Sequence, residues 1–228
     1  MTQLFDSYDK SYGSVVQSSI DFSGLPHSFF LSAKAELIRE RVAQHFGAGA
    51  KPDGLDVGCG LGTFHPLVRS AFGRFCGADV SASCIAQARA SNRDVDYADY
   101  DGAHLPYDDR SFDFVSAICV MHHVPPAQWQ NFTREMWRVL QPGGLLCVIE
   151  HNPLNPLTRL AVARCEFDRD AVLLRVGQTQ RLMDGAGLRN VHSRYFLLLP
   201  SAAAPFRRIE RLFGSVPLGA QYMTCGEA

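Results

Sequence analysis

The sequence predicts an α/β protein with a doubly wound, mostly parallel sheet that carries helices on both faces. Three observations support this fold class. Short apolar segments alternate with longer amphipathic segments along most of the chain. Residues 112–120 are nearly all apolar, as expected of a strand that is covered on both faces. A glycine-rich turn at residues 58–62 separates the first apolar segment from a helical one.

The first predicted element is a helix over residues 29–45, where apolar residues recur at helical spacing before Gly47 and Gly49 end it. The preceding residues, 1–28, are polar and aromatic, and we expect them to form an N-terminal cap or lid. The strand–helix alternation then begins. It predicts strands at 54–58, 74–79 and 95–98, with helices at 63–72 and 82–91.

Local residues mark several of the element ends. Ser81 is a good N-cap for the helix over 82–91, because its hydroxyl can accept a hydrogen bond from a free backbone N–H. Pro125 and Pro126 open a helix that runs to Leu140. The remaining predicted elements are strands at 112–120, 145–150, 189–198 and 219–225 and helices at 171–186 and 205–213. Connected by right-handed crossovers, these strands place functional residues in the loops after strands one to five.

Composition narrows the class of protein. With 228 residues, 46% hydrophobic and 20% charged, the chain suits one globular domain over residues 1–228. Lys plus Arg is 22 and Asp plus Glu is 23, so no basic excess favours nucleic acid as a partner. No apolar run reaches the roughly 18 residues needed to span a bilayer, and the N-terminus lacks a signal segment. We expect a cytoplasmic protein without a membrane span, either a monomer or a homodimer.

Cysteine spacing gives no sign of a metal site or of disulfides. The seven cysteines include no Cys-x-x-Cys pair, and several lie within apolar, strand-like segments. This pattern favours small buried side chains in a reducing compartment. We therefore expect no metal.

The strongest functional signal is the loop after the first predicted strand. It reads Leu55-Asp56-Val57-Gly58-Cys59-Gly60-Leu61-Gly62-Thr63. Glycine lets a backbone turn sharply and lie against a ligand. A dinucleotide fingerprint would need glycine where Thr63 stands, so the spacing is G-x-G-x-G, with Asp56 two residues before it. Asp79 ends the second strand, where a carboxylate can accept hydrogen bonds from ribose hydroxyls in either a nicotinamide or an adenosyl site.

These residues, in this order, resemble the class I S-adenosylmethionine-dependent methyltransferase family, of the type that acts on small molecules. The resemblance continues through residues 101–107, 111–113, 121–124 and 138–144, and it covers roughly residues 37–150. It implies a Rossmann-like methyltransferase fold of seven strands with the last strand antiparallel. It also implies an enzyme with S-adenosyl-L-methionine as its cofactor.

The resemblance further implies which residues hold the cofactor. These are Asp56, Gly58, Cys59, Gly60, Gly62, Asp79, Val80, Asp101, Gly102 and Cys119. The glycine loop would lie against the methionine part, with Cys119 on the same side and Asp56 near the amino group. Asp79 would hold the ribose hydroxyls and Val80 would pack on adenine. Asp101 would approach the adenine amino group with a backbone contact from Gly102, and Asp99 is a competing choice for Asp101.

Two histidines follow the fourth predicted strand, where a base would face the transferred methyl group. A hydroxyl nucleophile usually needs its proton removed, and histidine has a suitable pKa of about 6.5. We expect His122 or His123 to be catalytic, with His122 preferred, unless one packs under the sheet and the other caps the next helix. Candidate substrate contacts are His151 and Asn152, after the fifth strand, and Tyr8 and Tyr12, in the N-terminal segment.

The expected acceptor is a small molecule, such as a natural product, a sugar or a lipid-linked intermediate. The histidines favour methyl transfer to oxygen over nitrogen. The loop after the fourth strand lacks the Asn/Asp-Pro-Pro-aromatic tetrad of enzymes that methylate adenine or glutamine. One alternative is a non-catalytic module that binds S-adenosylmethionine. The other is a nicotinamide-dependent oxidoreductase, which Thr63 and the lack of a Tyr-x-x-x-Lys pair disfavour.

Overall fold

A computed structural model describes residues 12–198 and 213–228, and it confirms the predicted fold class. Its strands are β1 (Gly54–Val57), β2 (Phe75–Asp79), β3 (Asp96–Asp99), β4 (Phe112–Ile118), β5 (Leu140–His151), β6 (Arg189–Phe196) and β7 (Gln221–Glu227). They form one sheet in the order β3-β2-β1-β4-β5-β7-β6. The pairs from β3 to β5 are parallel, and β7 runs antiparallel to both of its neighbours, as the resemblance implies.

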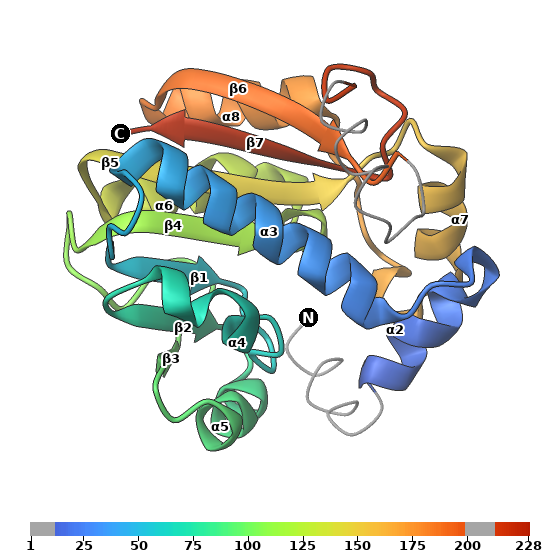
Figure 1. Cartoon of the computed structure of the whole chain (residues 1–228), viewed down its shortest axis with the longest axis horizontal. Helices are drawn as coiled ribbons and strands as arrows, with labels where there is room; N and C mark the ends of the chain where they lie inside the picture. Colours follow the sequence, from blue (N-terminus) through green and yellow to red (C-terminus); the bar gives the residue numbers. More distant parts are fainter. Residues whose placement is uncertain (1–11, 199–212) are drawn as a thin grey trace.

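Helices cover both faces of the sheet (Figure 1). They are α2 (Tyr12–Ile20), α3 (His27–Phe46), α4 (His65–Val68), α5 (Ala82–Ser91), α6 (Trp129–Arg138), α7 (Pro156–Arg164) and α8 (Val176–Ala186). Short 3-10 helices occur at η1 (Asp21–Ser23), η2 (Arg69–Ala71), η3 (Met121–His123), η4 (Pro126–Gln128) and η5 (Glu166–Asp168). None of the helices in the described ranges is long and apolar enough to cross a membrane.

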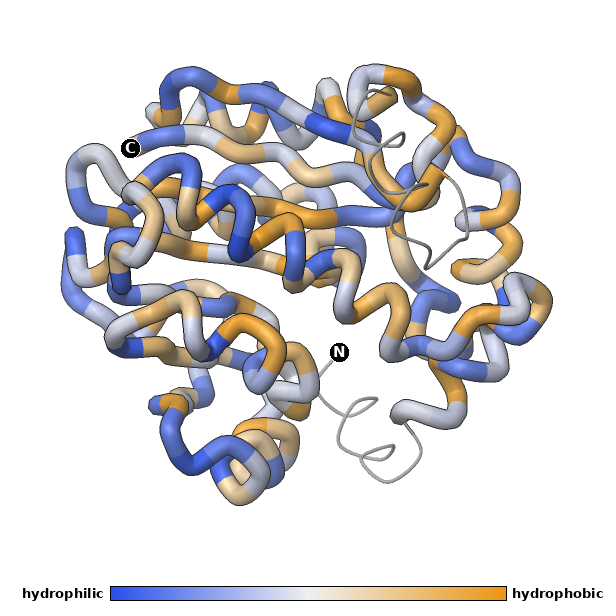
Figure 2. Tube along the Cα trace, viewed as in Figure 1, coloured by the Kyte–Doolittle hydropathy of each residue, from blue (hydrophilic) through white to orange (hydrophobic). Residues whose placement is uncertain are grey.

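Two apolar clusters, one on each face, hold the layers together. On one face, α3, α4 and α5 pack against residues such as Phe114 and Phe75. On the other face, α6 and α8 pack against Val115 and Ala117. Successive residues of β4 thus enter different clusters, which explains why that strand is apolar throughout. Figure 2 colours the chain by hydropathy and shows β4 and the neighbouring β5 largely in the hydrophobic colours.

Most predicted elements agree with the structure, and the differences have local causes. The helix at 82–91 has the predicted bounds, and the Ser81 hydroxyl accepts from the Cys84 N–H at 3.2 Å. β5 begins at Leu140 rather than at residue 145, because Leu140 pairs with Phe112 before a shift in register. The helix expected at 171–186 begins only at Val176. The helix expected at 205–213 falls almost wholly outside the described residues.

Helix α7 was not predicted, although its start carries a recognisable signal. Asn155 is the N-cap, and its side-chain oxygen accepts from the Thr158 N–H at 3.0 Å. Pro156 occupies the first turn, where its missing N–H costs nothing. Five of the seven cysteines are buried, as expected, and Cys59 and Cys119 are partly exposed.

The parallel strands direct their carboxyl ends to one edge of the sheet, and α2 and α7 lie beyond that edge (Figure 1). This arrangement brings the N-terminal helix and the segment after β5 to the same side as the glycine loop. Contacts between α2 and α7 close that side of the molecule.

Replacing a residue of the central strand tests the two-cluster core. Phe114 is fully buried, with its ring 5.2 Å from that of Phe72. We expect Phe114→Ala to lower the free energy of unfolding by about 3–5 kcal/mol in urea denaturation, because it leaves a cavity between two layers. Leu218→Ala is the control, since Leu218 is 58% exposed and should change stability by less than about 0.5 kcal/mol. Equal effects of the two variants would contradict this description of the core.

Candidate active site

A cavity of about 820 Å³ opens at the carboxyl ends of β1, β2 and β4. Nine of the ten residues expected to hold a cofactor line it: Asp56, Gly58, Cys59, Gly60, Asp79, Val80, Asp101, Gly102 and Cys119. Gly62 is the exception. A Cβ there would lie 2.4 Å from the Tyr97 hydroxyl oxygen, so Gly62 packs behind the loop.

The three glycines of the loop meet different requirements, although all have positive φ. A Cβ at Gly58 would lie 2.5 Å from the Val120 side chain, so only glycine lets the loop after β1 pass the loop after β4. Nothing lies within 4 Å of a Cβ at Gly60, whose φ is +53°. Gly60 therefore leaves its backbone open towards the cavity.

Asp79 connects the glycine loop to the end of β2. Its Oδ2 accepts from the Gly60 N–H at 2.8 Å and its Oδ1 from the Ser81 N–H at 2.9 Å. Burial raises the pKa of Asp79, while these backbone hydrogen bonds oppose the rise. Each carboxylate oxygen has a further lone pair for a ligand in the cavity.

Asp56 belongs to a buried polar network that the sequence did not reveal. Its Oδ1 accepts from the Ser116 hydroxyl at 2.7 Å, and its Oδ2 lies 3.2 Å from His65 Nε2. His65 Nδ1 in turn lies 2.6 Å from the Tyr97 hydroxyl. The one available signal was Ser116, a hydroxyl in an otherwise apolar strand, since buried polar groups need partners.

Of the two competing acids at the end of β3, Asp101, which follows the strand, borders the cavity, and Asp99, its last residue, does not. Asp101 Oδ1 accepts from the backbone N–H groups of Ala103 and His104, both at 2.8 Å. These bonds lower the pKa of Asp101 and fix the turn that begins with Gly102. The turn and Val80 form one end of the cavity wall.

A second cavity of about 290 Å³ lies between α2, α7 and the strand ends. Five residues line both cavities: His27, Lys34, Cys119, His123 and Phe167. The second cavity has apolar walls from α2 and α7, formed by Val16, Ile20, Leu157, Ala161 and Val162. The two cavities therefore meet at the end of β4.

The four expected substrate contacts have different positions. His151 lines the second cavity. Asn152 reaches neither cavity: it is 1% exposed, and its amide donates to the carbonyls of Pro217 and Gly219 at 3.0 and 2.7 Å. It thus anchors the loop before β7. Tyr12 is the first residue of α2, and Tyr8 lies outside the described residues.

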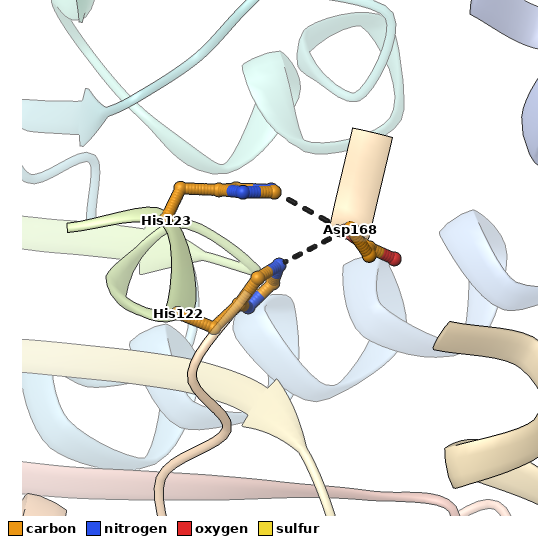
Figure 3. A group of neighbouring side chains, drawn as sticks. All are labelled: His122, His123 and Asp168. Carbon is orange, nitrogen blue, oxygen red and sulfur yellow. Dashed lines mark ion pairs between the residues drawn. The ribbon is translucent and has the colours of Figure 1, made fainter. Parts of the chain in front are cut away.

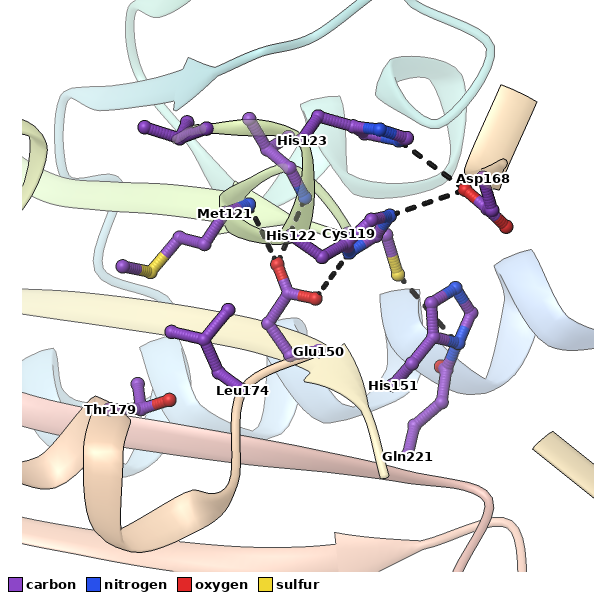
Figure 4. Close-up of polar contacts among 12 residues, drawn as sticks. Cys119, Met121, His122, His123, Glu150, His151, Asp168, Leu174, Thr179 and Gln221 are labelled. Carbon is purple, nitrogen blue, oxygen red and sulfur yellow. Dashed lines mark hydrogen bonds and ion pairs between the residues drawn. The ribbon is translucent and has the colours of Figure 1, made fainter. Parts of the chain in front are cut away.

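His122 lies between two carboxylates (Figure 4). Its Nδ1 is 2.6 Å from Glu150 Oε2, and its Nε2 is 3.4 Å from Asp168 Oδ1. Glu150 is held in turn by the backbone N–H groups of Val120 and Met121, at 3.0 and 2.8 Å. Burial alone would lower the pKa of His122, but the two carboxylates raise it to about 10. The preferred base of the sequence prediction is therefore enclosed and protonated near neutral pH.

His123 is the more accessible histidine, with 22% of its side chain exposed. Its Nε2 lies 3.4 Å from the same Asp168 oxygen (Figure 3). Burial and the neighbouring His122 charge lower the pKa of His123 to about 4, so its ring is neutral near pH 7. Burial would raise the pKa of Asp168, but contact with His122 holds it at about 2.

The ligand atoms of His122, His123 and Asp168 lie within 4.8 Å of one another, a spacing that also suits a metal ion. The ion pair of His122 with Asp168 and the contact of the His123 ring with the same carboxylate, both drawn in Figure 3, account for the orientation of all three side chains. No local pattern in the sequence identifies Glu150 as the partner of His122, or Asp168 as the partner of both histidines, because each comes from a distant segment.

Comparisons with known proteins identify the family. Residues 55–148 match a family model described as a methyltransferase domain. A probable S-adenosylmethionine-dependent methyltransferase of Mycolicibacterium smegmatis is 30% identical over 75% of this chain and 70% of its own length. The chain belongs to the class I S-adenosylmethionine-dependent methyltransferases. It is accordingly an enzyme of that family, and membership implies S-adenosylmethionine as the cofactor.

Two further comparisons agree with this assignment. Methyltransferase GfsG of Streptomyces halstedii is 32% identical over 69% of this methyltransferase and 60% of its own length. A solved structure from Thermotoga maritima, described as a possible histamine N-methyltransferase, aligns with a TM-score of 0.67. It covers 100% of this chain and 99% of that one at 19% identity, and it therefore supports the fold alone.

The larger cavity of this methyltransferase fits the cofactor. Its volume is within the range of small-molecule sites, roughly 300–1,000 Å³. Its walls combine an open glycine backbone at Gly60, a fixed carboxylate at Asp79 and the apolar side chain of Val80. These groups suit an amino-acid part, a ribose and a heterocyclic base respectively.

The glycine loop can be tested with two matched variants. Gly60 and Gly143 both have positive φ and open space at the Cβ position, but only Gly60 borders the cavity. We expect each Gly→Ala variant to lose about 1–2 kcal/mol of stability from backbone strain. Only Gly60→Ala should also weaken S-adenosylmethionine binding, by tenfold or more in calorimetric titration, because its methyl group occupies the cavity. Similar affinities in both variants would exclude Gly60 from the cofactor site.

Proposed function

We propose that this methyltransferase transfers the methyl group of S-adenosylmethionine to an oxygen of a small, largely apolar molecule, with nitrogen as the second choice of acceptor atom. The observation that supports this proposal is the meeting of two cavities at His123. The larger cavity carries the residues expected for the cofactor, and the smaller one is lined mainly by apolar side chains. An acceptor in the smaller cavity would therefore face the cofactor at the end of β4.

The cofactor roles follow the positions of the residues in the larger cavity. Asp79 accepts hydrogen bonds from the ribose hydroxyls, and Val80 packs on the adenine. Asp101 and Gly102, at the same end, contact the adenine amino group. Both oxygens of Asp56 are already engaged, which favours contact with the amino group of the methionine part through a water molecule.

The loops after β1 and β4 complete the methionine end of the site. Gly58, Cys59 and Gly60 lie against the methionine part, and Cys119 lines the same side. Gly62 supports this loop from behind by allowing the close approach of Tyr97. When bound, S-adenosylmethionine supplies a sulfonium methyl group to a nucleophile and becomes a neutral thioether.

His123 is the residue best placed to take the acceptor proton, since its ring is neutral near pH 7; its pKa of about 4 makes it a weak base until the acceptor oxygen beside it becomes negatively charged. It borders both cavities, and Asp168, 3.4 Å from its Nε2, would stabilise the imidazolium that forms. His122 holds Asp168 in place from the other side. His151, in the wall of the smaller cavity, contacts the acceptor. Positioning the acceptor oxygen against the methyl group supplies much of the remaining rate enhancement.

The apolar walls of the smaller cavity favour apolar acceptors, such as a natural product with a ring system, over sugars. Residues 12–28 supply part of that wall through Val16, Ile20 and Phe22. We therefore infer that residues 12–28, the described part of the predicted cap at 1–28, cover the acceptor as part of a single domain.

The test of this proposal is methyl transfer from S-adenosylmethionine with a labelled methyl group to a panel of phenols, aliphatic alcohols and amines. We expect label in hydroxyl compounds, and we expect His123→Gln to lower kcat by about 10²–10⁴-fold without changing cofactor affinity, because it removes the base. His192→Gln is the control, since His192 is exposed on β6. Cofactor binding with no transfer to any acceptor would favour the non-catalytic module, and unchanged kcat in His123→Gln would remove His123 from the reaction.

A further inference from the structure

One buried cation borders both cavities. Lys34 projects from α3, is 7% exposed, and lines the two cavities where they meet. Its ammonium group donates to Cys119 Sγ at 3.3 Å. Among residues 12–198 and 213–228, no carboxylate forms an ion pair with it. A buried charge normally requires an oppositely charged partner, so an anionic ligand is favoured at this position.

The nearby acidic groups do not supply that partner. Glu150 and Asp168 both face His122, at 2.6 and 3.4 Å. Burial raises the pKa of the Cys119 thiol, although Lys34 opposes the rise, so the sulfur is a neutral acceptor near pH 7. Lys34 also contributes to the lowered pKa values of His27 and His151, where burial is the main cause. Both rings are therefore uncharged near pH 7, and neither supplies an anion to the ammonium group.

The smaller cavity indicates the rest of the ligand. Its ionisable groups and Gln221 lie together with Lys34 around the end of β4: Cys119, His122, His123, His151 and Asp168. The remaining wall is largely apolar. A dry apolar cavity of about 150 Å³ is large enough for benzene, so a cavity of about 290 Å³ accommodates a substituted ring. The ligand is therefore an apolar ring that carries one anionic oxygen.

We propose that Lys34 binds the acceptor oxygen as an oxyanion, and that the acceptor is a molecule with an acidic hydroxyl, a phenol or an enol, on an apolar ring. This inference rests on the proposed function for the identity of the second cavity as the acceptor site. The hydroxyl proton passes to His123, whose imidazolium the adjacent oxyanion and Asp168 stabilise, and the ammonium group of Lys34 stabilises the negative charge that stays on the oxygen. Aliphatic alcohols and sugar hydroxyls are too weakly acidic to bind in this form.

The test uses 4-nitrophenol, whose ionised form absorbs visible light. Spectrophotometric pH titration with excess protein measures its pKa when bound. We expect the wild-type enzyme to prefer the phenolate about tenfold, a lowering of the probe's pKa by about one unit. Lys34→Met keeps the length of the side chain, removes the charge and should abolish this shift. Lys51→Met is the matched control, because Lys51 is exposed and lines neither cavity.

A second measurement uses the wild-type enzyme alone. It should bind 4-nitrophenolate more tightly than the neutral 4-nitroanisole, and equal or tighter binding of the anisole would overturn the proposal, even if Lys34→Met fails to fold. An unchanged probe pKa in a folded Lys34→Met variant would do the same. If that variant instead loses only affinity for S-adenosylmethionine, Lys34 contacts the cofactor carboxylate. The oxyanion proposal then fails, while the proposed methyl transfer stands.

Discussion

Two backbone N–H groups, those of Gly60 and Ser81, donate to the single carboxylate of Asp79, and the larger cavity depends on this connection. The parallel sheet brings the ends of β1 and β2 side by side, but it does not fix the loops that follow them. Asp79 does so by joining one loop to the other. Glycine at position 58 is needed for the same reason, because any side chain there would strike Val120 and push the loop away from β4. The cavity is thus a consequence of a few short contacts at one edge of the sheet.

The smaller cavity depends on a different interaction, the pairing of buried charges around His122. Glu150 at the end of β5 and Asp168 in η5 approach this ring from opposite sides. Their charges would be costly to bury without the imidazolium between them. The same Asp168 oxygen lies 3.4 Å from His123, where the two cavities meet, and Lys34 remains a buried cation with no ion pair among residues 12–198 and 213–228. The charge pairing in this methyltransferase therefore connects the segment after β5, which carries Asp168, to the two histidines after β4.

Much of the fold and most of the residues around the larger cavity followed from the sequence, because both depend on local patterns. Alternation of apolar segments located the seven strands, and the spacing of Gly58, Gly60 and Asp79 located the larger cavity. The position of Ser81 fixed the start of α5. β5 was predicted too short because its first residue, Leu140, belongs to the strand only through its pairing with Phe112, which is far from it in the sequence.

The smaller cavity was harder to predict, since its contacts join segments far apart in the chain. The pairing of His122 with Glu150 and Asp168 has no local signal, so the sequence favoured the histidine that the structure encloses. Lys34 lies in an ordinary amphipathic helix, and only the approach of α3 to Cys119 distinguishes it. Asn152 was expected to contact substrate because it follows β5. Its amide instead bonds to carbonyls before β7, whose position the sequence pattern does not reveal.

The measurement that tests the central claim most directly is calorimetric titration of the purified enzyme with S-adenosylmethionine and, separately, with NADH, repeated on Asp79→Ala and on Asp99→Ala. The carboxylate of Asp99 is exposed and outside both cavities, so it serves as the control. We predict that S-adenosylmethionine binds and that Asp79→Ala alone weakens it at least about tenfold, through the loss of charged hydrogen bonds. Binding of NADH alone, or equal affinities of the two variants for S-adenosylmethionine, would contradict this account of the cavity.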